Sequence, residues 1–550
     1  MRASRFIPRF LSVLAAILTL QSARADVIYS PGAPSGSFDV FPWVQNVDIS
    51  TYITNPGTHF HTFNVPGYHI LTSVELDMLD APNPTGGFSL SLHGLTFDGT
   101  NYDLPLEATL TGSSNPSTAG TYTYTGMVPL DPGSTYGIIA QVSPGGGTYT
   151  LSRAGAPTTG SGNYALIIQD APVAATINPD PFRLNDLVLF VGSEALSFTV
   201  NATPVDIDGG LQFANLQGEA LLAGGRTVLN DLNNRLFNLR AGRDRGKAGN
   251  GLVSTLDGAS VAGSENPESP IAARGSGAGQ WEAFTMVNFG DFELKGSGGN
   301  VDTWAPGLGI ERELSPGLNL GFAASFLSSS QDFTSGLGGF DFEGPVLSAY
   351  LSRVSGHFWN DFLYSHGTYD LDSLRDTGTG NPAAFGSSDA ESHAAQYNLG
   401  WYFPTEDETI VTGPFAGIDY FHGEIDGYTE TGGGIAGLIF TGQTVESLIT
   451  RVGWSISKTM EMDRATVTAQ ARLSYERQNL NNNEAGVSAI NAPFAASGTS
   501  QPAGQDYVVA GLGVKFDFDC KVSLLLSYQG QFFRNNVHDH LGGVTLSLPF

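Results

Sequence analysis

The chain has 550 residues, of which 25 are basic and 53 acidic, and its formal net charge is −28. Phosphate repels so acidic a chain, which excludes nucleic acid as a main partner. The chain has a single cysteine, Cys520, so no disulfide forms within it, and no apolar run reaches the length of a membrane-spanning helix.

The first 25 residues have the pattern of a secretory signal peptide. Three arginines precede an apolar run from Leu11 to Leu20, and an A-x-A cleavage site ends at Ala25. We therefore expect residues 1–25 to engage the Sec translocon and then to be removed. Their removal takes away four arginines and no acidic residue, so the net charge falls from −28 to −32.

Residues 26–203 form short alternating runs separated by turn residues. In LTSVELDML, Val74, Leu76 and Met78 alternate with Glu75 and Asp77, which predicts a small β-sandwich or jelly roll. The runs LTSVELDML, GFSLSLHG, TYTYTGMVPLDPGSTYGIIAQV and GGGTYTLSRAG resemble, in this order, the choice-of-anchor R family over about residues 36–155. This resemblance implies a surface-displayed domain without assigned chemistry. Family members usually end in a Pro-Glu-Pro sorting tail, whereas this chain carries a different C-terminal part.

Residues 26–203 contain few candidates for chemistry. His59 and His61 lie on one strand face with His69 nearby, which is the best metal candidate. Two half-exposed histidines on an edge strand explain the pattern equally simply, and we prefer that interpretation. Four tyrosines form either a glycan-binding stripe or part of the sandwich core, and we favour the core: Tyr122, Tyr124, Tyr136 and Tyr149. No complete motif for a hydrolase, a metalloprotease or a nucleotide site is present, so we expect neither catalysis nor a cofactor.

Residues 204–280 are predicted to be a linker that contains a helix over about 211–240. Leu229, Leu232, Leu236 and Leu239 recur at helical spacing. About 30 residues of helix reach roughly 45 Å, enough to thread a barrel from rim to rim. Arg235 and Arg240 are then expected to face a lumen lined by polar and acidic side chains.

The last 270 residues repeat a two-residue alternation. In the final run the apolar side chains share one face of a strand: Val544, Leu546, Leu548 and Phe550. Twelve such runs lie between residues 281 and 550, and a strand that crosses a membrane needs roughly 9–11 residues of this kind. The pattern predicts an all-β fold, with a twelve-stranded antiparallel transmembrane β-barrel over residues 281–550.

The connections between these runs separate a barrel from a soluble β-sandwich. Long connections such as 371–390 and 423–443 alternate with short ones such as 354–356 and 519–520. Outer-membrane barrels have short turns on the periplasmic rim and long loops on the outer rim, whereas sandwiches show no such alternation. We therefore prefer the barrel.

A signal peptide, an N-terminal passenger, a leucine-bearing helix and a C-terminal barrel that ends in Phe550 together resemble the autotransporters of type V secretion. The resemblance implies an outer-membrane location in a Gram-negative envelope, insertion by the barrel-assembly machinery that reads Phe550, and a passenger at the cell surface. The Gly/Ala/Ser-rich segment 241–280 departs from the family, which usually has few residues between helix and barrel.

The helix also resembles that of self-cleaving autotransporters, in which an asparagine attacks its own backbone inside the pore. Asn230-Asp231 stands here where those proteins have Asn-Asn. We favour an ordinary helix-surface asparagine and a passenger that is retained.

These observations predict a monomeric surface-display protein whose passenger serves adhesion or binds an unidentified surface ligand. Two alternatives stay open: a hydrolase passenger, and a solute porin with a periplasmic N-terminal domain.

Overall fold

The computed structural model describes the barrel, the helix and most strands of the N-terminal domain. The described residues are 26–29, 34–40, 59–64, 68–83, 85–97, 102–142, 148–154, 182–184, 195–196, 198–247, 281–294, 299–333, 338–377, 382–406, 409–499 and 504–549. The expected signal peptide and Phe550 therefore lie outside the described residues.

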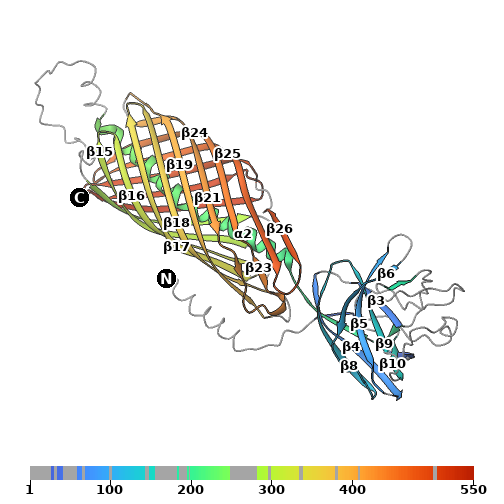
Figure 1. The fold of residues 1–550 in the computed structure, drawn as a ribbon. Coiled ribbons are helices and arrows are strands. Elements are labelled where there is room, and N and C mark those ends of the chain that lie inside the picture. Colours follow the sequence, from blue (N-terminus) through green and yellow to red (C-terminus); the bar gives the residue numbers. More distant parts are fainter. Residues whose placement is uncertain are drawn as a thin grey trace, which may run out of the picture.

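Twelve strands of the described part close into an antiparallel barrel (Figure 1). They are β14 (Trp281–Leu294), β15 (Gly299–Ser315), β16 (Leu318–Phe333), β17 (Gly338–Ser355), β18 (Phe358–Arg375), β19 (Ala384–Trp401), β21 (Ile410–Ile425), β24 (Gln443–Met462), β25 (Ala465–Ala489), β27 (Asp506–Phe518), β28 (Ser523–Phe532) and β29 (Val537–Pro549). Each pairs with its neighbours, and β14 pairs with β29 from Glu282↔Pro549 to Leu294↔Val537. The twelve-stranded barrel predicted from the alternation is confirmed.

Several strands extend further into the predicted long loops than the alternation indicated. β19 begins at Ala384 and β25 continues to Ala489. Beyond the lipid-facing zone an outward side chain meets water instead of hydrocarbon, so the apolar half of the pattern disappears while the backbone pairing continues. Short elements lie in the connections: β20 (Phe403–Pro404), β22 (Tyr428–Thr429), the 3-10 helix η2 (Gly434–Ala436), β23 (Leu438–Phe440) and β26 (Ala495–Thr499).

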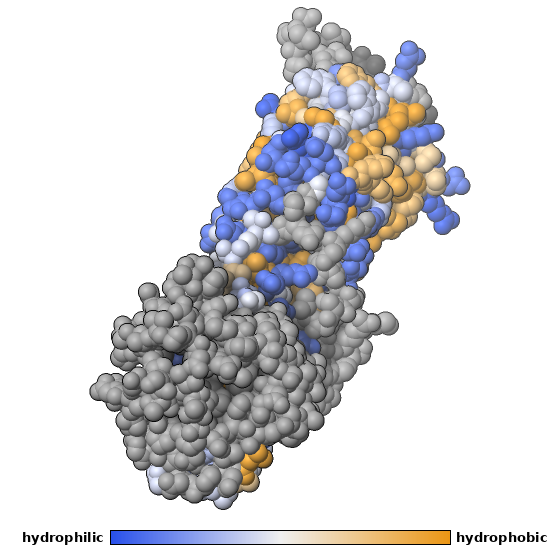
Figure 2. Space-filling view, turned by 90° about the vertical axis from the view of Figure 1, so that its right-hand side faces the viewer, coloured by the Kyte–Doolittle hydropathy of each residue, from blue (hydrophilic) through white to orange (hydrophobic). Residues whose placement is uncertain are grey.

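The outer wall of the barrel carries large apolar side chains. Leu308, Leu347 and Leu512 are 66%, 60% and 59% exposed, and Figure 2 shows apolar side chains in orange gathered on the wall. On β29, Val544, Leu546 and Leu548 face outward, while Thr545 and Ser547 are buried inside. An apolar exterior with a polar interior suits a barrel in a bilayer.

Two sheets form the N-terminal β-sandwich (Figure 1). One sheet contains β1 (Asp26–Tyr29), β2 (Pro34–Val40), β4 (His69–Asn83), β8 (Gly120–Leu130), β10 (Thr148–Ala154), β12 (Ala195–Leu196) and β13 (Phe198–Pro204). The other contains β3 (His59–Asn64), β5 (Phe88–Phe97), β6 (Tyr102–Leu104), β7 (Leu106–Leu110), β9 (Thr135–Val142) and β11 (Phe182–Leu184).

Leu76, Leu90, Leu92 and Ile138 are fully buried in the core between the sheets. Ser91 and His93 alternate with Leu90 and Leu92 along β5. Both are buried, and Ser91 Oγ lies 3.0 Å from His93 Nε2, so each satisfies the other.

Helix α2 (Ile207–Lys247) follows the sandwich directly and lies along the barrel lumen (Figure 1). Strand β13 ends at Pro204, and the Asp206 carboxylate caps the helix by accepting a hydrogen bond from the backbone N–H of Gly209 at 2.8 Å. With 41 residues, α2 exceeds the predicted 211–240 at both ends and is roughly 60 Å long. Among the described residues, no helix is long and apolar enough to cross a membrane.

We predict that Leu347→Arg, in the apolar wall, destabilises the folded protein in lipid vesicles by about 2–4 kcal/mol, because arginine loses hydration in hydrocarbon. Denaturant unfolding of the refolded protein measures this. Ser330→Arg, at an outward position of β16 nearer the long loops, is the control and should change the free energy of unfolding little. Equal losses at both positions would contradict the assignment of a lipid-facing belt.

Candidate functional site in the barrel lumen

The lumen of the barrel is the candidate functional site, because it contains α2 and the site residues predicted on this helix. The helix contacts all twelve barrel strands. Leu229, Leu232 and Leu236 are buried, as are Arg235 and Arg240. Leu239 belongs to α2, but its side chain lies outside the described residues.

Arg235 ties the helix to the first and last strands of the barrel. Its guanidinium lies 2.9 Å from Glu282 and 3.4 Å from Glu311, and it donates to the Ser547 hydroxyl at 2.7 Å. The same group lies 3.8 Å from the centre of the Phe284 ring. Two carboxylates, a hydroxyl and an aromatic face together compensate a cation that is 3% exposed.

Arg240 closes the lumen near the short turns. It forms an ion pair with Asp361, donates to the Tyr402 hydroxyl at 3.0 Å, and lies 3.9 Å above the Trp359 ring. Phe237 packs edge-on against Trp359 with 5.2 Å between ring centres. We call these five residues the lumen floor.

Amide groups hold the middle of the helix. Asn398 donates to Asn233 at 3.2 Å, and Arg472 donates to Asn234. The side-chain oxygens of Asn233 and Asn234 thus accept hydrogen bonds from residues of the barrel wall.

An aromatic cluster lies in the half of the lumen nearer the long loops, which the sequence analysis did not predict. Phe213 stacks on Phe333 at 5.4 Å between ring centres and packs against Phe340 at 5.6 Å and Phe440 at 6.1 Å. The lumen is therefore acidic and polar around Arg235 and Arg240, and partly aromatic around Phe213.

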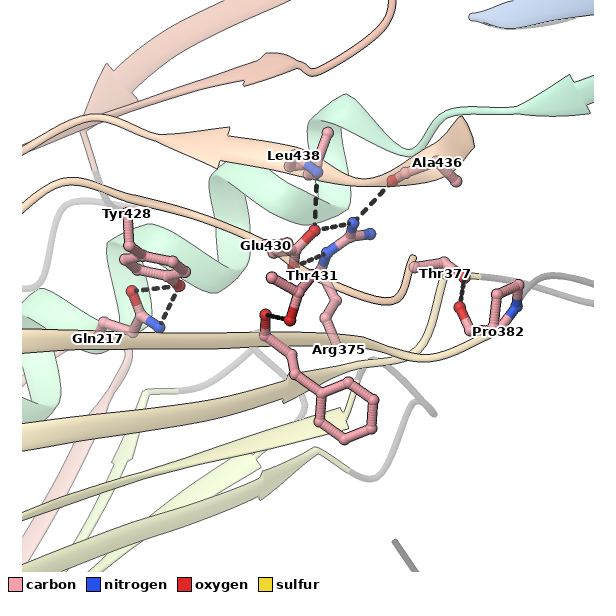
Figure 3. Close-up of polar contacts among 10 residues, drawn as sticks. Gln217, Arg375, Thr377, Pro382, Tyr428, Glu430, Thr431, Ala436 and Leu438 are labelled. Carbon is pink, nitrogen blue, oxygen red and sulfur yellow. Dashed lines mark hydrogen bonds and ion pairs between the residues drawn. The ribbon is translucent and has the colours of Figure 1, made fainter. Parts of the chain in front are cut away.

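Sequence reasoning also missed a buried ion pair between Arg375 and Glu430, close to the start of the helix (Figure 3). Arg375 ends β18, and Glu430 follows β22 in a connection expected to be a long loop. The two residues are 55 positions apart, so no local spacing could indicate the pair.

Asn230 and Asp231 lie on α2 within the barrel. Asn230 lines a cavity of about 20 Å³ together with Arg226, Glu476 and Tyr507, and Asp231 is 1% exposed. A cavity of this size holds about one water molecule. Attack of Asn230 on its own backbone is not tested by this geometry and stays a prediction.

The structure describes only part of the metal candidate in the N-terminal domain. The side chains of His59 and His61 on β3 lie outside the described residues, and His69 is buried at the start of β4. Within the described ranges, no group of three or more histidine, cysteine or acidic residues is arranged to hold a metal ion.

Tyr124, Tyr136 and Tyr149 are buried in the sandwich core. Burial raises the pKa of Tyr124, whose hydroxyl stays protonated and donates to the Ser113 carbonyl at 2.9 Å. These three tyrosines therefore serve packing, as the core interpretation predicted, whereas Tyr122 is half-buried against the same core and its hydroxyl lies 3.0 Å from Thr118 Oγ1.

We predict that Arg235→Ala lowers the free energy of unfolding by about 3–5 kcal/mol, because it removes the cation beside the buried Glu311 and the partly buried Glu282. Arg477→Ala is the matched control, since Arg477 is 54% exposed and lies 3.8 Å from Asp506. The control should lose less than about 1 kcal/mol. Denaturant unfolding in detergent measures both losses, and a small loss for Arg235→Ala would contradict the role assigned to this ion pair.

The comparisons with known proteins concern the C-terminal half of the chain. Solved structures with a similar fold include the translocator domain of the autotransporter NalP from Neisseria meningitidis, with 18% identity, a TM-score of 0.41, and coverage of 50% of this chain and 90% of that one. They also include the β-domain of the Bordetella autotransporter BrkA, with 15% identity, a TM-score of 0.39, and coverage of 50% and 100%. No curated protein matches the chain.

Residues 284–529 match the family described as the autotransporter β-domain. This match spans most of the closed barrel, from β14 to β28. The C-terminal part of this chain is an autotransporter β-domain, a translocator barrel of the outer membrane.

Proposed function

We propose that the chain displays its own N-terminal β-sandwich at the cell surface and retains it there through the helix in the lumen. The observation that carries this proposal is the direction of α2. Its first turns pack against Leu438 and Val487 at the rim with the long connections, and Arg240 lies beside Tyr402 at the rim with the short turns. Since short turns mark the periplasmic rim, this direction supports a sandwich on the outer side.

In this proposal the passenger leaves through the barrel and α2 stays behind as a plug. The contacts of Arg235 and Arg240 with the wall support a helix that stays in the lumen. Insertion by the barrel-assembly machinery, with Phe550 as its signal, follows from the family resemblance, and delivery by the Sec translocon follows from the signal peptide expected over residues 1–25. A monomeric state belongs to the same proposal.

For the displayed sandwich we propose adhesion or binding of a surface ligand. The rival hydrolase needs an accessible nucleophile and base. The Ser91–His93 pair has hydrogen-bonding geometry, but both side chains are buried, so a substrate has no access to them. Assays of surface-exposed protein against ester and glycoside substrates separate the two, because adhesion predicts no turnover.

The rival solute porin needs an open lumen. Two of the cavities beside α2 have volumes of about 20 and 10 Å³, too small for a solute larger than water. This filling supports a translocator whose pore is closed once the helix is in place.

We predict that protease added to intact cells removes the sandwich and leaves the barrel, because only the outer rim carries the passenger. Immunoblots with antibodies to each part measure this. The barrel serves as the internal control, and a periplasmic protein must stay intact. A sandwich cleaved only after the outer membrane is permeabilised would favour the porin with a periplasmic domain.

We predict that the culture medium contains no fragment that ends at Asn230, because the side chains of Asn233 and Asn234 hold this part of α2 against the barrel wall. Mass spectrometry of the medium and of the membrane fraction tests this. Asn230→Asp should leave the amount of full-length protein unchanged. A released fragment that ends at Asn230 and disappears in this variant would establish self-cleavage.

A further inference from the structure

The connection between β21 and β24 forms a structured unit at the long-loop rim. We call residues 426–442 the mouth hairpin; it contains β22, η2 and β23. β23 pairs with the end of β25 through Leu438↔Ala489 and Phe440↔Val487. Thr431 exchanges backbone hydrogen bonds of 2.8 Å with Phe385 of β19. At the long-loop rim the mouth hairpin therefore lies between β19 and β25, beyond the last residue of β21 and the first residue of β24.

One side of the mouth hairpin packs on the first turns of α2. Gln217 donates to the Tyr428 hydroxyl at 2.9 Å, and Phe440 lies 6.1 Å from Phe213 between ring centres. A Cβ added at Gly210 would lie 2.2 Å from Leu438 Cδ1, so a larger residue at 210 would displace the Leu438 side chain. The hairpin and the helix thus fit each other closely.

The Arg375–Glu430 ion pair fixes the hairpin in this position (Figure 3). The guanidinium donates to both carboxylate oxygens, at 2.8 and 2.7 Å, and to the Ala436 carbonyl at 2.9 Å. The backbone N–H of Leu438 donates to the same carboxylate at 2.8 Å. Both side chains are 1% exposed, so the pair is bidentate, desolvated and linked to both strands of the hairpin.

We propose that the mouth hairpin closes on α2 after the passenger has left, and that the Arg375–Glu430 ion pair holds it closed. We call this closure the lock and the ion pair its catch. This inference rests on the proposed display function. While chain of the sandwich still passes the mouth, it occupies the space in which the mouth hairpin packs on Gly210 and Phe213. The Gly210–Leu438 contact cannot form while passenger chain occupies the same place, and the buried ion pair completes the closed arrangement only when the hairpin lies inward.

The order of events is tested with a cysteine pair. Gly210→Cys with Leu438→Cys is made in a Cys520→Ser background, which removes the sole native thiol. The leucine whose side chain would clash with a Cβ at position 210 is itself replaced, so the pair fits where Gly210→Cys alone would not. Pulse-labelled cells are sampled over time for cross-linking of 210 to 438 by a short bifunctional reagent and for protease accessibility of the sandwich.

The lock predicts that the cross-link appears only after the sandwich has become accessible. A cross-link that precedes accessibility, in cells that do display the sandwich, would overturn the lock and leave the display function intact. A cross-link in cells whose sandwich stays protected would overturn both. Full accessibility without any cross-link, in a barrel that still migrates as folded in unheated gels, would also overturn the lock.

The catch is tested by Arg375→Met, which leaves the Glu430 carboxylate buried and unpaired. We expect the ratio of open to closed mouth to rise roughly a hundredfold, seen as openings in planar bilayer recordings and as cleavage within the mouth hairpin by added protease. Arg375→Met with Glu430→Leu should return most of the closed state, because it removes the lone charge.

Arg451→Met is the matched control. Arg451 is also buried and pairs with Asp419, but it joins the neighbouring strands β24 and β21 away from the mouth hairpin. The control should not open the mouth. Openings as frequent in Arg451→Met as in Arg375→Met, or a closed mouth in Arg375→Met, would show that the pair is not the catch.

Discussion

Every part of this structure depends on backbone hydrogen bonds that hydrocarbon cannot replace. An unpaired strand edge in a bilayer leaves each exposed N–H and C=O unsatisfied, so the sheet must close on itself. The pairing of β14 with β29 achieves this closure between segments at opposite ends of the domain. The closed wall then provides the enclosed space in which a helix with two buried arginines is stable.

Inside the wall, charge and shape specify one position for α2. Arg235 lies between two carboxylates, Arg240 lies on the lumen floor, and aromatic side chains surround Phe213 at the other end. Sliding the helix by a single turn, about 5.4 Å, would separate both arginines from their carboxylates and leave several buried charges unpaired. The lumen is therefore specific for one register of the helix.

The barrel could be predicted from sequence because two environments, lipid and lumen, impose a simple alternation on each strand. The limits of the prediction have physical causes. Above the lipid the first residues of β19, apart from Phe385, are polar or small, so they were assigned to a loop. In β5 both faces are covered, so Ser91 and His93 are buried although they alternate with the apolar core residues.

The leucine spacing indicated α2, but the pairing of its arginines with particular wall residues could not be inferred. Glu282 and Asp361 come from strands far apart in the chain, and only the closed barrel brings them to the helix. The same holds for Arg375 and Glu430. Their meeting depends on the inward position of the mouth hairpin, which no periodicity encodes.

The junction between sandwich and helix has a mechanical consequence. β13 is paired on both sides, by β1 and β4, and the chain passes from it into the capped first turn of α2. Tyr68, beside this junction, packs on Phe494 of the barrel with 4.9 Å between ring centres. A domain mounted in this way points in one direction from its support, unlike a domain on a flexible tether. Such a domain reaches a smaller volume around the barrel than a tethered domain would, but it loses less orientational entropy on binding.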